Sequence, residues 1–454
     1  MILARILKPS DFGVFAIVTA LTSLFLPVID SGLTQIIVKL PVYTRNLGDI
    51  FHTINLMVGF VVLFIIVVLG FIASKYYGEP NLFVLTAING FSVFLLAISN
   101  IRFATLIRNK RFVPIFIADV SGSIIGVFVA IWFSLNGFGV FSLVIQQLAN
   151  YIVRYLVFRT SLEDVYSIKH YSLLLQATNH IKSGSLVLLS RLIGGFTFSL
   201  DRLMVGHFFN IDTLGYYSTA IRVAVLPDAV IRTPLTNVVL AHTARKPKTE
   251  RQKDYVTTSN IIFLVSAIPC ILLVIAGDII VPIIMGQQWI ESGVYLQILG
   301  IMAFGKIFHG LSAIIHFSEM EIKRWVKGCT ITVFFIISVP LIYINIYPNP
   351  ILFTICFSLI YFIVWFTYYC RTLFCFTGRN SEPLLKLIRM VLCTVLGGLG
   401  ISWVARALIE PLILSKLSSI FYVMVLLFVI MSGALFVNLI FNREQIRSLL
   451  AKVR

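Results

Sequence analysis

The composition of this 454-residue chain excludes an ordinary soluble protein, because 59% of its residues are hydrophobic, only 12% are charged and its mean hydropathy is +0.97. The net charge of +17 would suggest nucleic acid in a soluble protein, but the basic residues fall mostly between apolar runs, so we expect no nucleic-acid partner. The six cysteines lie within or beside apolar runs without metal-ligand spacing, so we predict no disulfide, no metal and no cofactor.

The chain opens with a segment that is too short to cross a membrane. Residues 1–7 (MILARIL) are apolar except for Arg5, and PSDFG at 9–13 is a turn signal before the next apolar run. Because a membrane helix needs about 20 apolar residues, we interpret residues 1–7 as the end of a helix whose beginning is missing. One further preceding helix would place both chain ends in the cytoplasm.

Thirteen apolar stretches follow, and each is long enough to cross a bilayer as a helix that satisfies its own backbone polar groups. They predict an all-α polytopic membrane protein. The stretches are 12–38, 53–73, 82–103, 113–135, 138–159, 184–206, 213–240, 258–285, 293–317, 326–346, 350–375, 384–409 and 417–441.

The connections between these stretches alternate in charge, which predicts the topology. Connections such as 108–111 and 245–253 are rich in Lys and Arg, whereas 136–137 and 207–212 contain neither. Since an excess of Lys and Arg marks cytoplasmic loops, we expect the basic connections and the basic C-terminal tail to be cytoplasmic.

Two segments resemble each other and indicate an internal repeat. DFGVF at 11–15 and TLGYY at 213–217 each open an apolar run that contains a proline and, beyond it, an aspartate. We therefore expect two parallel six-helix lobes around a central cavity, plus two C-terminal helices. The expected parts are an N-terminal lobe at 1–160, a cytoplasmic linker at 161–183, a C-terminal lobe at 184–376, and two helices with a basic tail at 377–454.

The same residues carry a resemblance to a known family. LARILKPSDFG at 3–13, followed by DSGL at 30–33, resembles the opening of bacterial polysaccharide transporters. These are the O-antigen and exopolysaccharide flippases of the multidrug/oligosaccharidyl-lipid/polysaccharide superfamily. SLDRLMVG at 199–206, followed by LGYY at 214–217, is similar to the second-lobe signature of that family. The resemblance is less specific over the last six helices.

The resemblance implies a flippase and not an enzyme. Its substrate would be an oligosaccharide repeat unit linked through pyrophosphate to a polyprenyl lipid. The protein would move this unit across the bacterial inner membrane by alternating access, for O-antigen, capsule or exopolysaccharide synthesis. Membrane lipid, a polysaccharide polymerase and a chain-length regulator are the further partners that such a pathway implies.

Ionisable side chains within the predicted spans are the candidate site residues, because a charge in the bilayer normally faces a cavity or a partner. Cations outnumber acids there, which suits an anionic ligand, and guanidinium groups match phosphate oxygens well. We expect Arg191, Arg222 and Lys306 to converge on the cavity between the lobes. The full set of candidates is Arg5, Arg154, Arg191, Arg202, Arg222 and Lys306 for the substrate, and Asp30, Asp119 and Asp228 for ion coupling.

Some of these charges also have a purely structural interpretation. Asp228 and Arg232 stand four residues apart on one predicted helix, so they would neutralise each other. Arg202 lies near the predicted external end of its helix, where its side chain can reach headgroups or pair with an acid of a neighbouring helix. Both interpretations stay open for these residues.

Two glycines and two histidines also have both a functional and a structural interpretation. Gly122 and Gly126 form a G-x-x-x-G face that suits either a polar site or close helix packing. His309 and His316 lie one heptad apart, beside Lys306, and suit either proton sensing or packing.

The sequence contains no complete motif for ATP hydrolysis. GIMAFGKI at 300–307 resembles a phosphate-binding loop, but Ile307 replaces the required Ser or Thr and the run lies in an apolar span.

Two rival functions stay open. A drug or cation exporter of the same superfamily should show an acidic cavity rather than a basic one, and a polytopic polysaccharide polymerase should have larger external loops.

Overall fold

The computed structural model describes residues 2–30, 33–40, 43–162, 178–232, 234–235, 247–319 and 321–409. Throughout these ranges the regular elements are helices, as the sequence predicts, and no strand occurs in them. Nine helical segments of this described part are long and apolar enough to cross a membrane. The predicted span at 417–441 lies outside the described residues. The chain divides into two compact units, Met1–Gly215 (unit 1) and Tyr216–Arg454 (unit 2).

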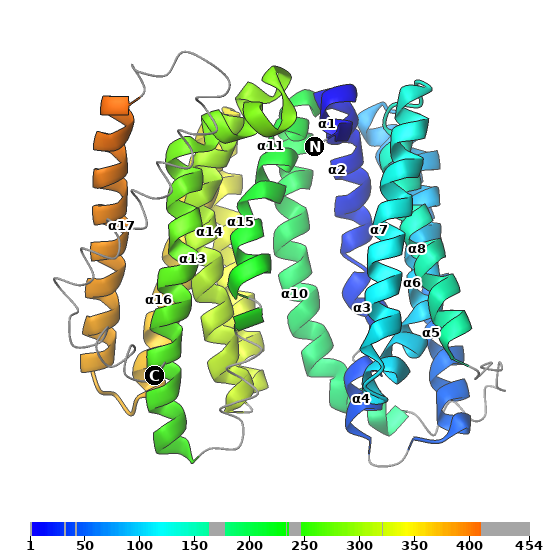
Figure 1. Cartoon of the computed structure of the whole chain (residues 1–454), viewed down its shortest axis with the longest axis horizontal. Helices are drawn as coiled ribbons and strands as arrows, with labels where there is room; N and C mark the ends of the chain where they lie inside the picture. Colours follow the sequence, from blue (N-terminus) through cyan, green and yellow to red (C-terminus); the bar gives the residue numbers. More distant parts are fainter. Residues whose placement is uncertain are drawn as a thin grey trace. The chain divides into compact units, whose positions relative to one another are not determined.

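Long helices make up most of the described part of unit 1 (Figure 1). Its elements are α1 (Ile2–Ile6), α2 (Pro9–Ser23), α3 (Leu26–Asp30), α4 (Leu33–Lys39), α5 (Arg45–Tyr77), α6 (Asn81–Arg108), α7 (Phe112–Leu135), α8 (Phe141–Ser161), α10 (Thr178–Phe208) and the first turn of α11 (Ile211–Ala224).

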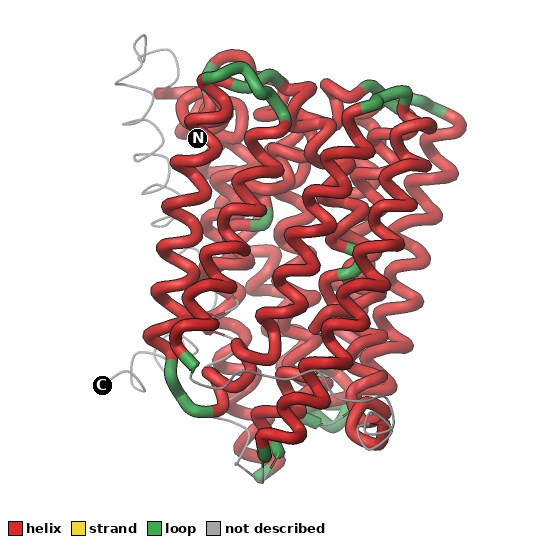
Figure 2. Tube along the Cα trace, turned by 90° about the vertical axis from the view of Figure 1, so that its right-hand side faces the viewer, coloured by secondary structure: helices red, strands yellow, loops and turns green. Residues whose placement is uncertain are grey.

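Unit 2 has the same character, and Figure 2 shows that most loops lie at helix ends. Its elements are the remainder of α11, the π-helical turn η2 (Asp228–Arg232), α13 (Lys248–Met285), the 3₁₀ turn η3 (Gln287–Trp289), α14 (Ile290–Ser318), α15 (Ile322–Ile346), α16 (Pro350–Phe376) and α17 (Glu382–Ile409).

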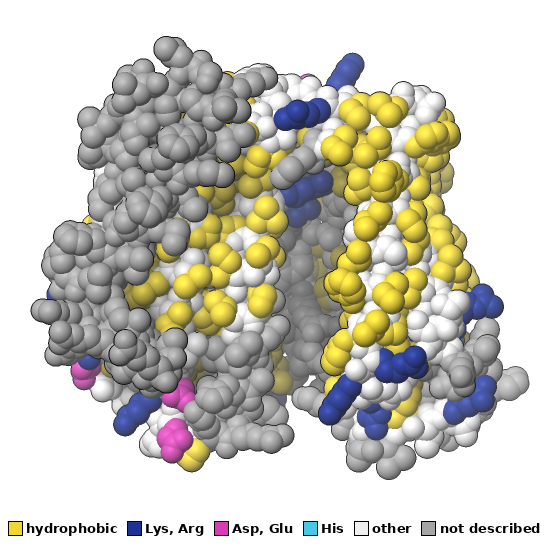
Figure 3. All heavy atoms as spheres, viewed as in Figure 1, with side chains coloured by type: hydrophobic (Ala, Val, Ile, Leu, Met, Phe, Trp, Pro, Cys, Tyr) yellow, Lys and Arg dark blue, Asp and Glu magenta, His cyan; other side chains and the backbone are white. Residues whose placement is uncertain are grey.

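The surface of unit 1 fits a lipid environment. On α7, large apolar side chains are exposed, among them Phe116 (68%), Phe128 (70%) and Trp132 (60%). Figure 3 shows apolar side chains over the middle of the visible helices of this unit, with Lys and Arg side chains gathered toward their lower ends. Such a surface is costly in water and stable in a bilayer.

The first predicted span, 12–38, is not one continuous helix. α2 ends at Ser23, and two shorter helices, α3 and α4, follow it. Pro27 explains the first break, because its nitrogen carries no hydrogen and its ring clashes with the carbonyl group four residues earlier. Carbonyl groups that lose their helical partner inside a membrane need other donors.

Side chains of α6 supply such donors. The amide of Asn100 donates to the carbonyl oxygen of Ile29 at 3.3 Å, in the last turn of α3. The guanidinium group of Arg108 donates to the carbonyl oxygens of Ile37 (2.7 Å) and Leu40 (2.6 Å) at the end of α4. Arg108, which the sequence places among the cytoplasmic loop charges, therefore also caps a helix.

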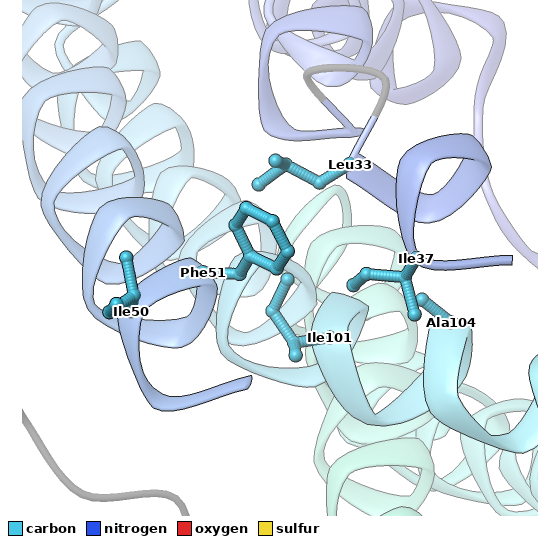
Figure 4. Packing of buried hydrophobic residues seen from close by; sticks show 6 residues of the cluster. All are labelled: Leu33, Ile37, Ile50, Phe51, Ile101 and Ala104. Carbon is cyan, nitrogen blue, oxygen red and sulfur yellow. The ribbon is translucent and has the colours of Figure 1, made fainter. Parts of the chain in front are cut away.

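Apolar packing holds the broken segment in place. Figure 4 shows buried side chains of α4, α5 and α6 in contact around Phe51. A second cluster joins α3 to α5 and α6 around Ile66. The first cluster consists of Leu33, Ile37, Ile50, Phe51, Ile101 and Ala104.

Close glycine contacts join α7 to α8. A Cβ atom on Gly122 would lie 3.0 Å from the carbonyl oxygen of Asn150, and one on Gly126 would lie 2.9 Å from that of Gln146. The G-x-x-x-G face therefore lets two helix backbones approach each other. The packing interpretation of these two glycines is confirmed.

The two repeat segments meet each other through their glycines. A Cβ atom on Gly13 would overlap the carbonyl oxygen of Ile211, and one on Gly215 would overlap that of Pro9. Ile211 lies four residues before Gly215, and Pro9 lies four residues before Gly13. The contact between the starts of α2 and α11 is therefore symmetric. This contact supports the internal repeat inferred from the sequence.

The span predicted at 213–240 is also interrupted. α11 ends at Ala224, and residues Asp228–Arg232 form a π-helical turn. Pro227 precedes this turn and disfavours a continuous α-helix for the same reason as Pro27. Because π-helical turns are frequent at functional sites, η2 marks a candidate site.

Candidate functional site

The π-helical turn of unit 2 is closed by an ion pair. The Nε atom of Arg232 donates to Oδ1 of Asp228, and Nη2 donates to Oδ2 at 3.1 Å, so the guanidinium group binds the carboxylate with two hydrogen bonds. The two side chains are only 15% and 14% exposed. The mutual neutralisation expected from their spacing is therefore confirmed, on a π-helical turn.

Helix α14 packs against this ion pair. The guanidinium group of Arg232 occupies the space that a Cβ atom on Gly310 would need, so only glycine fits there. Lys306 lies one turn earlier on α14, and His309 directly precedes Gly310, so both residues lie within one turn of the contact with Arg232. We call Asp228, Arg232, Lys306 and His309 the α14 charge cluster.

An aromatic wall lies beside the cluster. The ring of His309 lies 5.4 Å from that of Trp325 on α15 and 4.2 Å from that of Trp365 on α16. His316 donates from Nδ1 to the carbonyl oxygen of Ser312 (2.9 Å), and its Nε2 accepts from the hydroxyl group of Tyr368 (3.2 Å). His309 is thus held by ring packing and His316 by hydrogen bonds, which favours the structural interpretation of both.

Two candidate cations of unit 2 lie on different helices. Lys306 is half-buried near the middle of α14, and Arg222 is half-buried in the last turn of α11, shortly before η2. The side chain of Arg191 lies outside the described residues. The convergence of Arg191, Arg222 and Lys306 on one cavity therefore stays a prediction.

In unit 1 a candidate cation and a candidate acid lie beside each other. Arg154 on α8 is 3.6 Å from the carboxylate of Asp119 on α7, with side chains 21% and 54% exposed. The guanidinium carbon of Arg154 also lies over the rings of Phe103 (5.1 Å) and Phe158 (5.3 Å). A substrate phosphate at Arg154 would have to compete with Asp119.

The remaining candidates are more dispersed. Arg202 is half-buried near the end of α10, and its Nε atom is buried without a hydrogen-bond partner among the described residues. Arg5 is exposed on α1, whereas the side chain of Asp30 lies outside the described residues. Their roles in binding and coupling stay predictions.

Sequence reasoning missed one buried group of charges. Asp49 and His52 of α5 and Arg102 of α6 are only 3%, 6% and 6% exposed. The apolar run of α5 begins at residue 53, but the helix itself begins at Arg45, so Asp49 and His52 were assigned to a loop. Their spacing of three residues, one face of a helix, is the signal that could have found them.

Comparisons with known proteins agree with this architecture. A family model described as "Polysaccharide biosynthesis protein" matches residues 2–294. The succinoglycan biosynthesis transport protein ExoT of Rhizobium meliloti (strain 1021) is 22% identical over 315 residues, which make up 67% of this chain and 61% of that protein. The chain thus spans about three-fifths of the length of this curated relative.

Two solved structures share the fold. The lipid II flippase MurJ in its inward closed conformation has a TM-score of 0.65 and 14% identity, covering 96% of this chain and 98% of its own. A multidrug resistance MATE family transporter of the MOP superfamily, in its inward-facing conformation, has a TM-score of 0.61 and 15% identity, covering 84% and 94%. The predicted all-α polytopic fold is confirmed. By its family match, the chain belongs to the polysaccharide biosynthesis protein family.

Proposed function

We propose that the protein is a flippase of the inner membrane of a bacterium. Its substrate is an oligosaccharide repeat unit linked through pyrophosphate to a polyprenyl lipid, as used for O-antigen, capsule or exopolysaccharide. It acts by alternating access and catalyses no covalent step. The family match, the transport function in the name of the ExoT relative and the fold shared with a lipid II flippase support this proposal.

The observation that carries the proposal is the α14 charge cluster. It combines the ion pair of Arg232 and Asp228, which packs against Gly310, with Lys306 one turn earlier, near the middle of α14. Charges at this depth are expensive and typically belong to a substrate or ion path. The balance of the cluster is basic, which suits a pyrophosphate and disfavours the cations that an exporter of the same superfamily would carry.

Within the cluster, the three charged residues have distinct proposed roles. Lys306 supplies a mobile ammonium group for phosphate oxygens. Arg232 is already bound to Asp228, so it takes up a phosphate only by exchanging one anion for another. Such an exchange would tie substrate binding to a change at Asp228, which is the role of ion coupling proposed for this aspartate.

The first test is the surface polysaccharide of the strain that expresses the protein. In a deletion strain, the variant Lys306→Gln should leave polysaccharide at about one tenth of the wild-type amount or less, because a hydrogen bond from a charged group is worth about 1.5–3 kcal/mol. Arg222→Ala should act in the same direction. The protein level in the membrane should not change.

The matched control is Lys386→Gln, which removes an exposed lysine at the start of α17. It should preserve polysaccharide. Wild-type polysaccharide with Lys306→Gln would contradict the substrate role of the cluster. Loss of a drug-resistance phenotype with intact polysaccharide would favour an exporter, and accumulation of single repeat units on the outer face of the membrane would favour a polymerase.

A further inference from the structure

Unit 2 carries a groove of about 560 Å³ where α14 ends, α15 begins and α16 ends. None of the residues of the α14 charge cluster lines it. On the α15 side the wall includes Arg324, Lys327 and Ile331, and on the α16 side it includes Arg371, Thr372 and Cys375.

The two walls are fixed against each other by a close contact. The hydroxyl group of Tyr368 occupies the space that a Cβ atom on Gly328 would need, so α16 approaches the backbone of α15 there. The same hydroxyl group lies 3.2 Å from Nε2 of His316 on α14. Three helices thus position the groove, and the long side chains of its walls extend from a rigid base.

The charges in the groove are unevenly paired. Glu319 lies 2.7 Å from Arg251 of α13, and Glu321 pairs with Arg324. Lys327 and Arg371 are exposed, and among the described residues no carboxylate lies within ion-pair distance of either. The groove therefore presents two cations from facing helices to an external anion.

The groove changes from charged to apolar along α15. Lys327 and Arg371 each lie about 7.5 Å from the adjacent helix end, at ~1.5 Å per residue. Because α15 and α16, with 25 and 27 residues, have about the length of a whole bilayer including its headgroups, we place this depth among the headgroups. Farther along α15, Ile331, Phe334 and Phe335 are 49%, 65% and 47% exposed. This order, cations first and apolar surface beyond, matches the phosphate and acyl chain of a phospholipid.

We propose that this groove, the α15–α16 groove, binds the phosphate group of an anionic membrane phospholipid. The ammonium group of Lys327 and the guanidinium group of Arg371 bind the phosphate oxygens, and one acyl chain lies along Ile331 and Phe334. The proposal requires only that the chain lies in a membrane. It is therefore independent of the substrate that the protein moves.

Cys375 provides a reporter, because it is an exposed cysteine that lines the groove. The full-length protein, with the other five cysteines replaced, carries a bimane fluorophore at this position in nanodiscs. Phosphatidylglycerol or phosphatidylcholine with brominated acyl chains is added at equal mole fraction. Brominated phosphatidylglycerol should quench the fluorophore more strongly.

The variants Lys327→Gln and Arg371→Gln should each lower this preference for phosphatidylglycerol about fivefold. This is the change in affinity expected when one basic residue near an anionic membrane surface is removed. Lys323→Gln, which removes an exposed lysine of α15 that does not line the groove, should preserve it. Native mass spectrometry of the unlabelled protein gives a second measurement, the ratio of the two lipids that remain bound.

Equal quenching by the two lipids, with equal retention in the mass spectrum, would overturn the proposal. An equal loss of preference in Lys323→Gln would overturn it as well, because the effect would then belong to general surface charge. Displacement of phosphatidylglycerol by an equimolar polyprenyl pyrophosphate would assign the groove to the substrate and overturn the lipid assignment.

Discussion

Asp228 and Arg232 show how a single ion pair can stabilise an interrupted membrane helix. Their side chains are mostly buried and joined by two hydrogen bonds. The spacing of these two residues predicted their contact, because residues four apart share one helix face. The sequence does not predict that this ion pair packs against the part of α14 that carries Lys306 and His309. That contact depends on Gly310, which leaves space for the Arg232 side chain.

Removal of one partner should leave an uncompensated charge. Arg232→Gln should destabilise the protein by about 3 kcal/mol, a typical cost of breaking a buried pair. The double variant Asp228→Asn/Arg232→Gln should recover part of this loss, and thermal unfolding in detergent measures both. The exposed pair of Glu382 and Lys386, also four residues apart, is the matched control, and its disruption should have no measurable effect. Additive losses in the double variant would contradict the coupling.

At the scale of the helix, the sequence predicts where the membrane helices begin and end better than it predicts where they are interrupted. Long apolar runs such as 113–135 and 350–375 became α7 and α16 with nearly the same bounds, because run length alone decides whether a helix can cross a bilayer. The spans with Pro27 and Pro227 were predicted as unbroken helices and are interrupted. In the first of these spans, α3 and α4 end at carbonyl groups that accept hydrogen bonds from Asn100 and Arg108 of α6, and local sequence does not reveal these donors.

The contact between the starts of α2 and α11 leaves no space for a side chain at Gly13 or Gly215. An added methyl group in Gly13→Ala or Gly215→Ala would meet a backbone carbonyl oxygen, which cannot move aside as a flexible side chain can. Each variant should lose about 1–3 kcal/mol of stability, measured as a lower melting temperature in detergent. Gly194→Ala in α10 is the control, because no atom of the described residues lies within 4 Å of the added carbon. A wild-type melting temperature for Gly13→Ala would show that the helices do not approach this closely.

At the scale of the whole molecule, hydropathy, loop charges and two short signatures were sufficient to predict the membrane fold and the family. The comparisons confirm both. The lobe boundaries at 160, 183 and 376 stay a proposal. The candidate site was predicted only in part, because depth in a predicted span identifies a charge such as Lys306 but not its neighbours. Asp49 was missed because the apolar run of α5 begins only at residue 53, so this residue looks like a loop charge in sequence. Arg102 lies within the predicted span 82–103, but the sequence does not show its neighbours on α5.

Transport in proteoliposomes tests the central claim most directly. Purified protein is reconstituted with a polyprenyl-pyrophosphate-linked oligosaccharide, and a lectin outside the vesicles reports the sugar that reaches the outer leaflet. The wild-type protein should move the lipid faster than protein-free vesicles do. Lys306→Gln should be about tenfold slower or more, whereas Lys386→Gln should match the wild type. Wild-type protein that moves no sugar above the protein-free rate, or Lys306→Gln that moves it at the wild-type rate, would contradict the account.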